Sequence, residues 1–155
     1  MHVIKAPESI SKNFRTEKLI FLAGSIEMGL AEDWQSRVEN YFKDLATYTL
    51  LNPRRDDWDS SWVQAFENPN FYQQVNWELK GLERADKIIW YVSPDTKAPI
   101  SLLELGLFAA SGKVLLCCPT GFWRKGNVDI VCERYHIPVY EKLDELLAKH
   151  FPKSR

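Results

Sequence analysis

The chain has 155 residues, of which 45% are hydrophobic and 26% charged, and a formal net charge of −1 at pH 7. This length fits one globular domain of the usual ~100–150 residues, and the composition is neither that of a disordered chain nor that of a membrane-spanning protein. The mixed, nearly balanced charge offers no basic surface for nucleic acid or an anionic membrane. We therefore expect a single domain over residues 1–155 that acts on small molecules.

The start of the chain lacks the apolar stretch and the small-residue cleavage site of a secretory signal, which predicts a cytoplasmic protein. The cysteines are odd in number, and two of them, Cys117 and Cys118, are adjacent in an apolar run. We expect them to be reduced core residues. The three histidines are too scattered to predict a metal site.

Short apolar runs alternate along the chain with segments of helical periodicity. Strands are expected at residues 18–24, 48–51, 87–92, 113–118 and 137–140. Helices are expected at residues 32–42, 72–85, 101–111, 128–134 and 142–150. This alternation predicts an α/β fold with a parallel sheet and helices on both faces, preceded by an N-terminal extension over residues 1–17. Ligands of such sheets bind outside the carboxyl ends of the strands, which selects the loops after residues 24, 52, 92 and 118.

The predicted loop over residues 52–70 is rich in charges and tryptophan, and a loop of this length usually has a function. Arg55 has the geometry to bind a phosphate or carbonyl, and Trp58 to stack on a nucleobase. Asp57 is a candidate to bind or protonate the base. The alternative is a solvated charged loop whose tryptophans cover the edge of the sheet.

Two further elements are candidates for the site. The turn after the first apolar run, Gly24-Ser25-Ile26, would present backbone N–H groups to a phosphate or sugar oxygen, unless it is a purely structural turn. It lacks the patterns of ATP-binding and dinucleotide-binding loops. Glu104 lies among leucines near an expected helix N-terminus. It is therefore either a nucleophile or a first-turn glutamate whose charge interacts favourably with the helix dipole.

Three segments, FLAGSI, NWELKGLERADKIIWYV and LLELGLFAASGKVLL, together give the chain a family resemblance. It resembles the nucleoside 2-deoxyribosyltransferases and their relatives that hydrolyse deoxynucleoside monophosphates, over residues 19–140. The resemblance implies a flavodoxin-like, five-stranded parallel sheet, a homo-oligomer, and no metal or organic cofactor. It also implies that Glu104, in the E-L-G element, is the nucleophile that forms a glycosyl-enzyme intermediate.

The resemblance extends to other positions. It implies that Glu78 contacts the base or sugar, although a solvated helix carboxylate is the alternative, and that Asn127 reaches the sugar of a neighbouring subunit. Ala98 stands where the transferases commonly carry an aspartate, so Asp95 or another loop acid replaces it, or the activity differs from base exchange. Ser101 would donate its hydroxyl to the substrate or act as a helix N-cap.

The sequence thus predicts cleavage or transfer at the N-glycosidic bond of a nucleoside or nucleoside monophosphate. Glu104 would attack C1′, and Asp57 would assist the departing base. Two alternatives remain open: an NAD-type glycohydrolase, and a nucleotide-binding module without catalytic activity.

Overall fold

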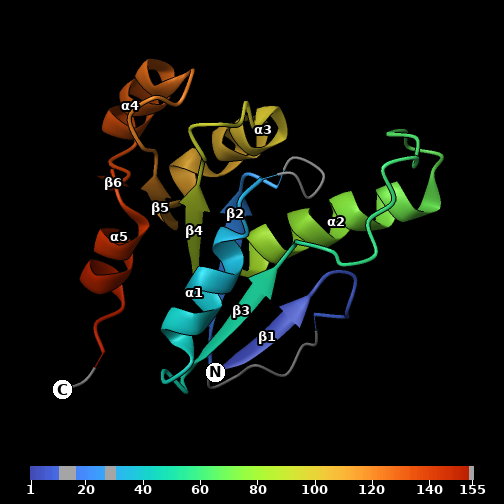
Figure 1. Ribbon diagram of the computed structural model, residues 1–155, viewed down its shortest axis with the longest axis horizontal. Coiled ribbons are helices and arrows are strands. Elements are labelled where there is room, and N and C mark those ends of the chain that lie inside the picture. Colours follow the sequence, from blue (N-terminus) through green and yellow to red (C-terminus); the bar gives the residue numbers. More distant parts are fainter. Residues whose placement is uncertain (11–16, 27–30, 154–155) are drawn as a thin grey trace.

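The computed structural model describes residues 1–10, 17–26 and 31–153. Its strands form one parallel sheet in the order β1-β3-β2-β4-β5-β6 (Figure 1). Their bounds are β1 His2–Lys5, β2 Lys18–Gly24, β3 Tyr48–Asn52, β4 Lys87–Tyr91, β5 Val114–Cys117 and β6 Val139–Tyr140. Without β1, this order is that of the flavodoxin-like fold, with the switch in strand order between β2 and β4. The α/β fold class predicted from the sequence is confirmed.

The number of strands differs from the expected five. Residues 2–5, inside the predicted N-terminal extension, form the edge strand β1 and pair with β3, with Ile4 opposite Leu51. The segment is short and has polar residues at both ends, so it lacks the continuous apolar run that identifies a buried strand. Residues 11–16 of the extension lie outside the described part of the chain.

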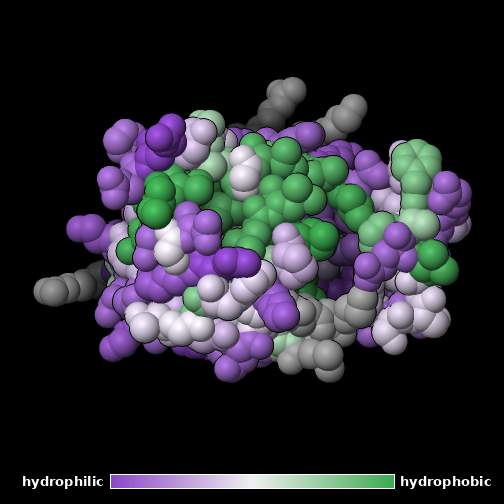
Figure 2. All heavy atoms as spheres, turned by 90° about the horizontal axis from the view of Figure 1, so that it is seen from above, coloured by the Kyte–Doolittle hydropathy of each residue, from purple (hydrophilic) through white to green (hydrophobic). Residues whose placement is uncertain are grey.

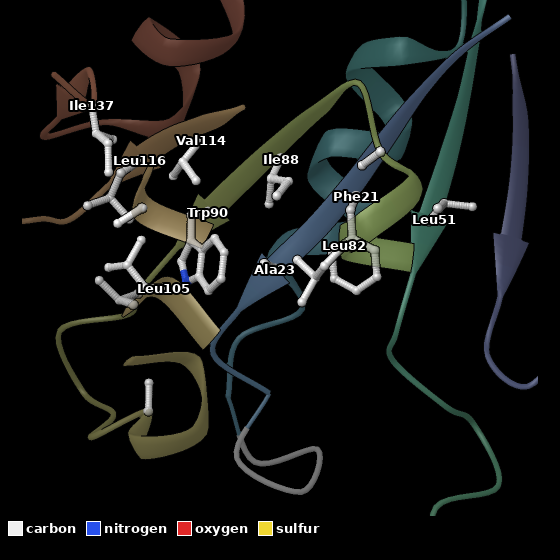
Figure 3. Packing of buried hydrophobic residues seen from close by; sticks show 14 of the residues in the cluster. Phe21, Ala23, Leu51, Leu82, Ile88, Trp90, Leu105, Val114, Leu116 and Ile137 are labelled. Carbon is white, nitrogen blue, oxygen red and sulfur yellow. The ribbon is translucent and has the colours of Figure 1, made fainter. Parts of the chain in front are cut away.

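In the part of the chain that the structure describes, five α-helices cover the sheet on both faces (Figure 1). One face packs against α1 (Trp34–Phe42) and α5 (Leu143–His150). The other packs against α2 (Pro69–Arg84), α3 (Pro99–Phe108) and α4 (Lys125–Arg134). Figure 3 shows this second layer, with Trp90 of β4, Leu82 of α2 and Leu105 of α3 in the same apolar cluster. None of the helices within the described ranges is long and apolar enough to cross a bilayer.

Helix α2 begins three residues before the expected Tyr72 because an Asn-Pro pair starts it. The side chain of Asn68 accepts hydrogen bonds from the backbone N–H groups of Asn70 and Phe71, and Pro69 takes the first helical position. Asparagine is a favoured N-cap, and proline is preorganised for the first turn. The first turns of α2 therefore extend beyond the edge of the sheet, on the side of the carboxyl ends of the strands (Figure 1).

The second half of α2 is held against the sheet and the N-terminal segment. Gly81 lies so close to the ring of Phe21 that a Cβ there would overlap it. The indole N–H of Trp77 donates a 2.7 Å hydrogen bond to the Glu8 carbonyl. This packing fixes the helix that carries Glu78.

Candidate active site

Two carboxyl groups on different helices, Glu78 on α2 and Glu104 on α3, are electrostatic neighbours. Burial and, to a smaller extent, the negative charge of Glu78 raise the pKa of Glu104 to about 8. Burial also raises the pKa of Glu78 to about 7, against the lowering effect of a hydrogen bond from Gln74. Because two coupled groups with such values titrate together, the pair retains a proton near neutral pH.

The start of α3 decides the surroundings of Glu104. The helix begins at Pro99, after Ala98 in the left-handed region with φ 47°, so the interpretation of Ser101 as an N-cap is wrong. Ser101 is buried inside the helix, three residues before Glu104 and on the same face. Glu104 lies past the first turn, where the helix dipole has weakened, so burial rather than the dipole sets its pKa.

Glu78 is held by Gln74 of its own helix, and Gln74 is bonded in turn to the start of the loop after β3. One nitrogen, Nε2 of Gln74, donates to Glu78 Oε1 and to the Pro53 carbonyl, both at 2.9 Å. Pro53 follows directly after β3, at the carboxyl edge of the sheet. Glu78 is therefore not the freely solvated helix carboxylate that was its alternative interpretation.

The turn after β2 packs closely against the end of β4 and the loop that follows it. Gly24 has φ 133°, and a Cβ there would overlap the Tyr91 carbonyl of β4. The Ser25 N–H donates to that same carbonyl at 2.9 Å, and the Ser25 hydroxyl accepts from the Ser93 N–H and bonds to the Thr96 hydroxyl. Ser25 is buried and these groups are engaged within the protein. The geometry supports the structural interpretation of this turn over the substrate-binding one.

The loop after β3 brings three of its predicted residues into one cluster. The Arg55 guanidinium donates twice to the Asp57 carboxylate, each at 2.9 Å, and lies 5.0 Å from the ring centroid of Trp62. The Trp58 ring packs edge-on against Trp62, with its buried indole N–H without a partner. The hydrogen bonds from Arg55 lower the pKa of Asp57. Such a carboxylate is a poor proton donor, which does not support Asp57 as the acid.

Asn127 lies apart from Glu78 and Glu104. It is exposed on the first turn of α4, at a hollow of about 280 Å³ between α3 and α4. The hollow is lined mainly by apolar side chains such as Leu102 and Val131, together with Arg124, and not by Glu78 or Glu104. Asp95, a possible replacement for the acid missing at position 98, is exposed on the loop after β4.

Sequence reasoning missed two residues of this region, Gln74 and Thr96. Gln74 precedes Glu78 by four residues, so helical spacing alone could have paired them. Thr96 contacts Ser25 across the switch in strand order, and no sequence pattern signals that contact. Within the described ranges, no group of three histidine, cysteine or acidic side chains is arranged to hold a metal ion.

The comparisons with known proteins fit this geometry. A family model described as nucleoside 2-deoxyribosyltransferase like matches residues 17–122, a span that includes β2 to β5 and both glutamates. No curated protein matches the chain.

Proposed function

Because the chain belongs to the nucleoside 2-deoxyribosyltransferase-like family, we propose that it cleaves or transfers the N-glycosidic bond of a nucleoside or nucleoside monophosphate. The observation that carries the proposal is that two largely buried carboxyl groups on different helices, Glu78 and Glu104, lie close enough for the charge of Glu78 to raise the pKa of Glu104. Two carboxyl groups, one ionised and one protonated, are the chemical requirement for glycosidic cleavage through a covalent intermediate.

Glu104 is the proposed nucleophile. In its ionised form a carboxylate oxygen attacks C1′, a C–O bond forms, and the C1′–N bond breaks with its electron pair going to the base. The partly desolvated position of Glu104 raises its pKa, and this makes its carboxylate a stronger nucleophile once the proton has left.

Glu78 is the proposed proton donor to the departing base. Because the pKa of Glu104 lies above that of Glu78, a single proton rests mainly on Glu104, and the productive arrangement is the minor form with the proton on Glu78 and the charge on Glu104. Transfer of this proton to the base nitrogen leaves Glu78 ionised. Water or a second base then attacks C1′ of the intermediate, the C–O bond to Glu104 breaks, and the acceptor's proton returns to Glu78.

The remaining predicted site residues have different parts in this proposal. Trp58 and Arg55 lie in the loop after β3 and would contact the base or a phosphate, as predicted. Asp57 would hold the Arg55 guanidinium rather than protonate the base, since its own pKa is lowered. Ser101, on the Glu104 face of α3, would bind the sugar through its hydroxyl.

The test is chromatographic detection of free base from a panel of nucleosides and nucleoside monophosphates, each with and without an acceptor base. Wild-type protein is expected to release or exchange a base. Glu104→Gln is expected to lower the rate by about a thousandfold or more, because an amide cannot form the intermediate. Glu83→Gln is the matched control, since Glu83 is an exposed glutamate on the same helix as Glu78.

The outcomes separate the alternatives. Release of nicotinamide from NAD, with no release from the panel, would make the protein an NAD-type glycohydrolase. No free base from any compound, with ligand affinity equal in wild type and Glu104→Gln, would leave a binding module. Exchange that requires the acceptor would identify a transferase, and release without it a hydrolase.

We also propose that the protein forms a homo-oligomer through α3. This helix exposes three large apolar side chains, Ile100, Leu103 and Leu107, each about 60% accessible. Figure 2, which looks down on the carboxyl ends of the strands, shows a broad apolar area on this face. A second copy over this surface would remove the apolar area from water and bring its Asn127, at the adjacent hollow, to the interface.

A further inference from the structure

Gln74 is buried, with 5% of its surface accessible, and its side chain amide is the link between α2 and the end of β3. Its Nε2 donates one N–H to the Pro53 carbonyl and the other to Glu78 Oε1. Its Oε1 is buried and has no hydrogen-bond partner. A buried amide that leaves its acceptor unpaired costs free energy, so the arrangement is not one that packing alone would favour.

The Pro53 carbonyl dictates which way the amide points. If the Gln74 amide were turned over, its oxygen would face the Pro53 carbonyl oxygen, and two acceptors would repel each other. The Pro53 carbonyl therefore fixes the Gln74 amide with its N–H group, not its oxygen, toward Glu78. With Oε1 of Glu78 occupied by that donor, a proton on this carboxyl group must sit on Oε2.

We propose that Gln74 is a positioning residue that fixes the orientation of Glu78 and leaves Oε2 as the oxygen that holds the mobile proton. The catalytic part of this inference rests on the proposed function, in which Glu78 donates a proton to the departing base. Gln74 itself does not touch the reacting atoms.

The same hydrogen bond sets how tightly Glu78 keeps its proton. An N–H donor stabilises the carboxylate, and in this site it opposes burial, which raises the pKa of Glu78. The charge of Glu78 in turn acts on Glu104 of α3, whose pKa it raises. Loss of the Gln74 donor should raise the pKa of Glu78 by about one unit, the value expected for one hydrogen bond to a charged group.

The direct test follows the carboxyl carbons of ¹³C-labelled protein by NMR during a pH titration. Gln74→Met removes the donor with little change of length, and Gln74→Glu keeps the shape. In both variants the Glu78 signal is expected to titrate at higher pH than in the wild type, and Glu78→Gln assigns that signal. Asn76→Ala is the control, since Asn76 is an exposed amide on α2 that bonds to the Tyr72 carbonyl.

Kinetics provide the second measurement. The proposed reaction requires a proton on Glu78, so its rate falls at high pH when that proton is lost. In Gln74→Met this alkaline fall is expected to move upward by about one pH unit, with kcat lowered by about tenfold and KM little changed. A residue with only a structural role would lower the amount of folded enzyme without moving the pH profile.

The outcomes are distinguishable. If the Glu78 titration is the same in wild type, Gln74→Met and Gln74→Glu, the inference is overturned whether or not the protein is an enzyme. If the titration moves but no compound releases a base, the proposed function fails and the positioning of Glu78 stands. Circular dichroism of each variant excludes unfolding as the cause of a changed titration.

Discussion

The hydroxyl groups of Ser25 and Thr96 lie 2.6 Å apart and connect the turn after β2 to the loop after β4. Both residues are buried, and the Ser93 N–H donates to the same Ser25 oxygen. The bond spans the switch in strand order, so it holds together the two loops that border the candidate site.

Ser25→Ala should therefore lower stability rather than substrate affinity. The substitution leaves the buried Ser93 N–H without its acceptor, a loss of about 1–3 kcal/mol in the free energy of unfolding. Chemical denaturation measures this loss. KM for the nucleoside or nucleotide substrate should stay within about twofold of the wild-type value. A large rise of KM with unchanged stability would instead restore Ser25 as a substrate ligand.

Gly24→Ala should strongly destabilise the folded protein. A Cβ at this position would overlap the Tyr91 carbonyl, and φ of 133° is a conformation that residues with side chains rarely adopt. The expected loss exceeds about 3 kcal/mol, measured by urea denaturation. Gly106→Ala is the control: it lies within α3 with open space around it, and should raise stability by about 0.5–1 kcal/mol.

The carboxyl pair predicts how stability depends on pH. The folded-state pKa of Glu104, about 8, and that of Glu78, about 7, both lie above the ordinary value of 4.5. As pH rises from about 4.5, the unfolded chain loses these protons first, so the stabilisation present at low pH is lost by about pH 8. Glu104→Gln lacks one of these groups. Its stability relative to wild type should improve by about 2–4 kcal/mol between about pH 5 and pH 9.

Denaturation curves of both proteins across that pH range check this prediction. A difference in stability that does not change with pH would mean that Glu104 titrates near its ordinary value in the folded protein. In that case the coupling to Glu78 would not exist either.

Asp57→Asn tests whether the loop aspartate supplies the proton. The substitution weakens the two hydrogen bonds from Arg55 and loosens the cluster with Trp62. We expect KM to rise by a few fold while kcat and the pH profile stay close to wild type, because positioning and not proton transfer is lost. A large fall of kcat with a displaced pH profile would return the acid's role to Asp57.

Leu107→Glu tests the interface on α3. Leu107 is 63% accessible, and a charge there would be buried against a second copy without a partner. Light scattering is expected to report a smaller particle than for wild type at the same concentration. Val63→Glu is the control, because Val63 is equally exposed, at 66%, but lies in the loop after β3. A monomeric wild type would contradict the proposal.

The central sheet was readable in the sequence because its strands are continuous apolar runs. Residues 18–24 form β2 with the bounds predicted for it, and β4 begins at Lys87 as expected. Strands buried on both faces have this composition, so burial and sequence pattern coincide. The edge strand β1 has one neighbour and polar ends, and its place depends on pairing with β3, which is a contact distant in sequence.

The candidate site was predictable only in part. Glu104 and Glu78 stood out by type and by family resemblance, but their coupling depends on how α2 and α3 pack on the sheet. The orientation of Glu78 depends on the backbone carbonyl of Pro53. The pattern of residue types in a sequence does not predict where a backbone carbonyl lies. Ser25 has the residue type of a ligand and the environment of a core residue.

The N-terminal residues that precede β2 limit how far the protein can be truncated. The family match begins at residue 17, which makes residues 1–16 look dispensable. Removal of these residues would expose the β3 edge to pairing with other molecules. It would also delete the hydrogen bonds that Trp77 and Arg84 of α2 donate to the Glu8 and Ile10 carbonyls. A chain that begins at residue 17 should therefore aggregate, and the helix that carries Glu78 would lose two hydrogen bonds to the N-terminal segment.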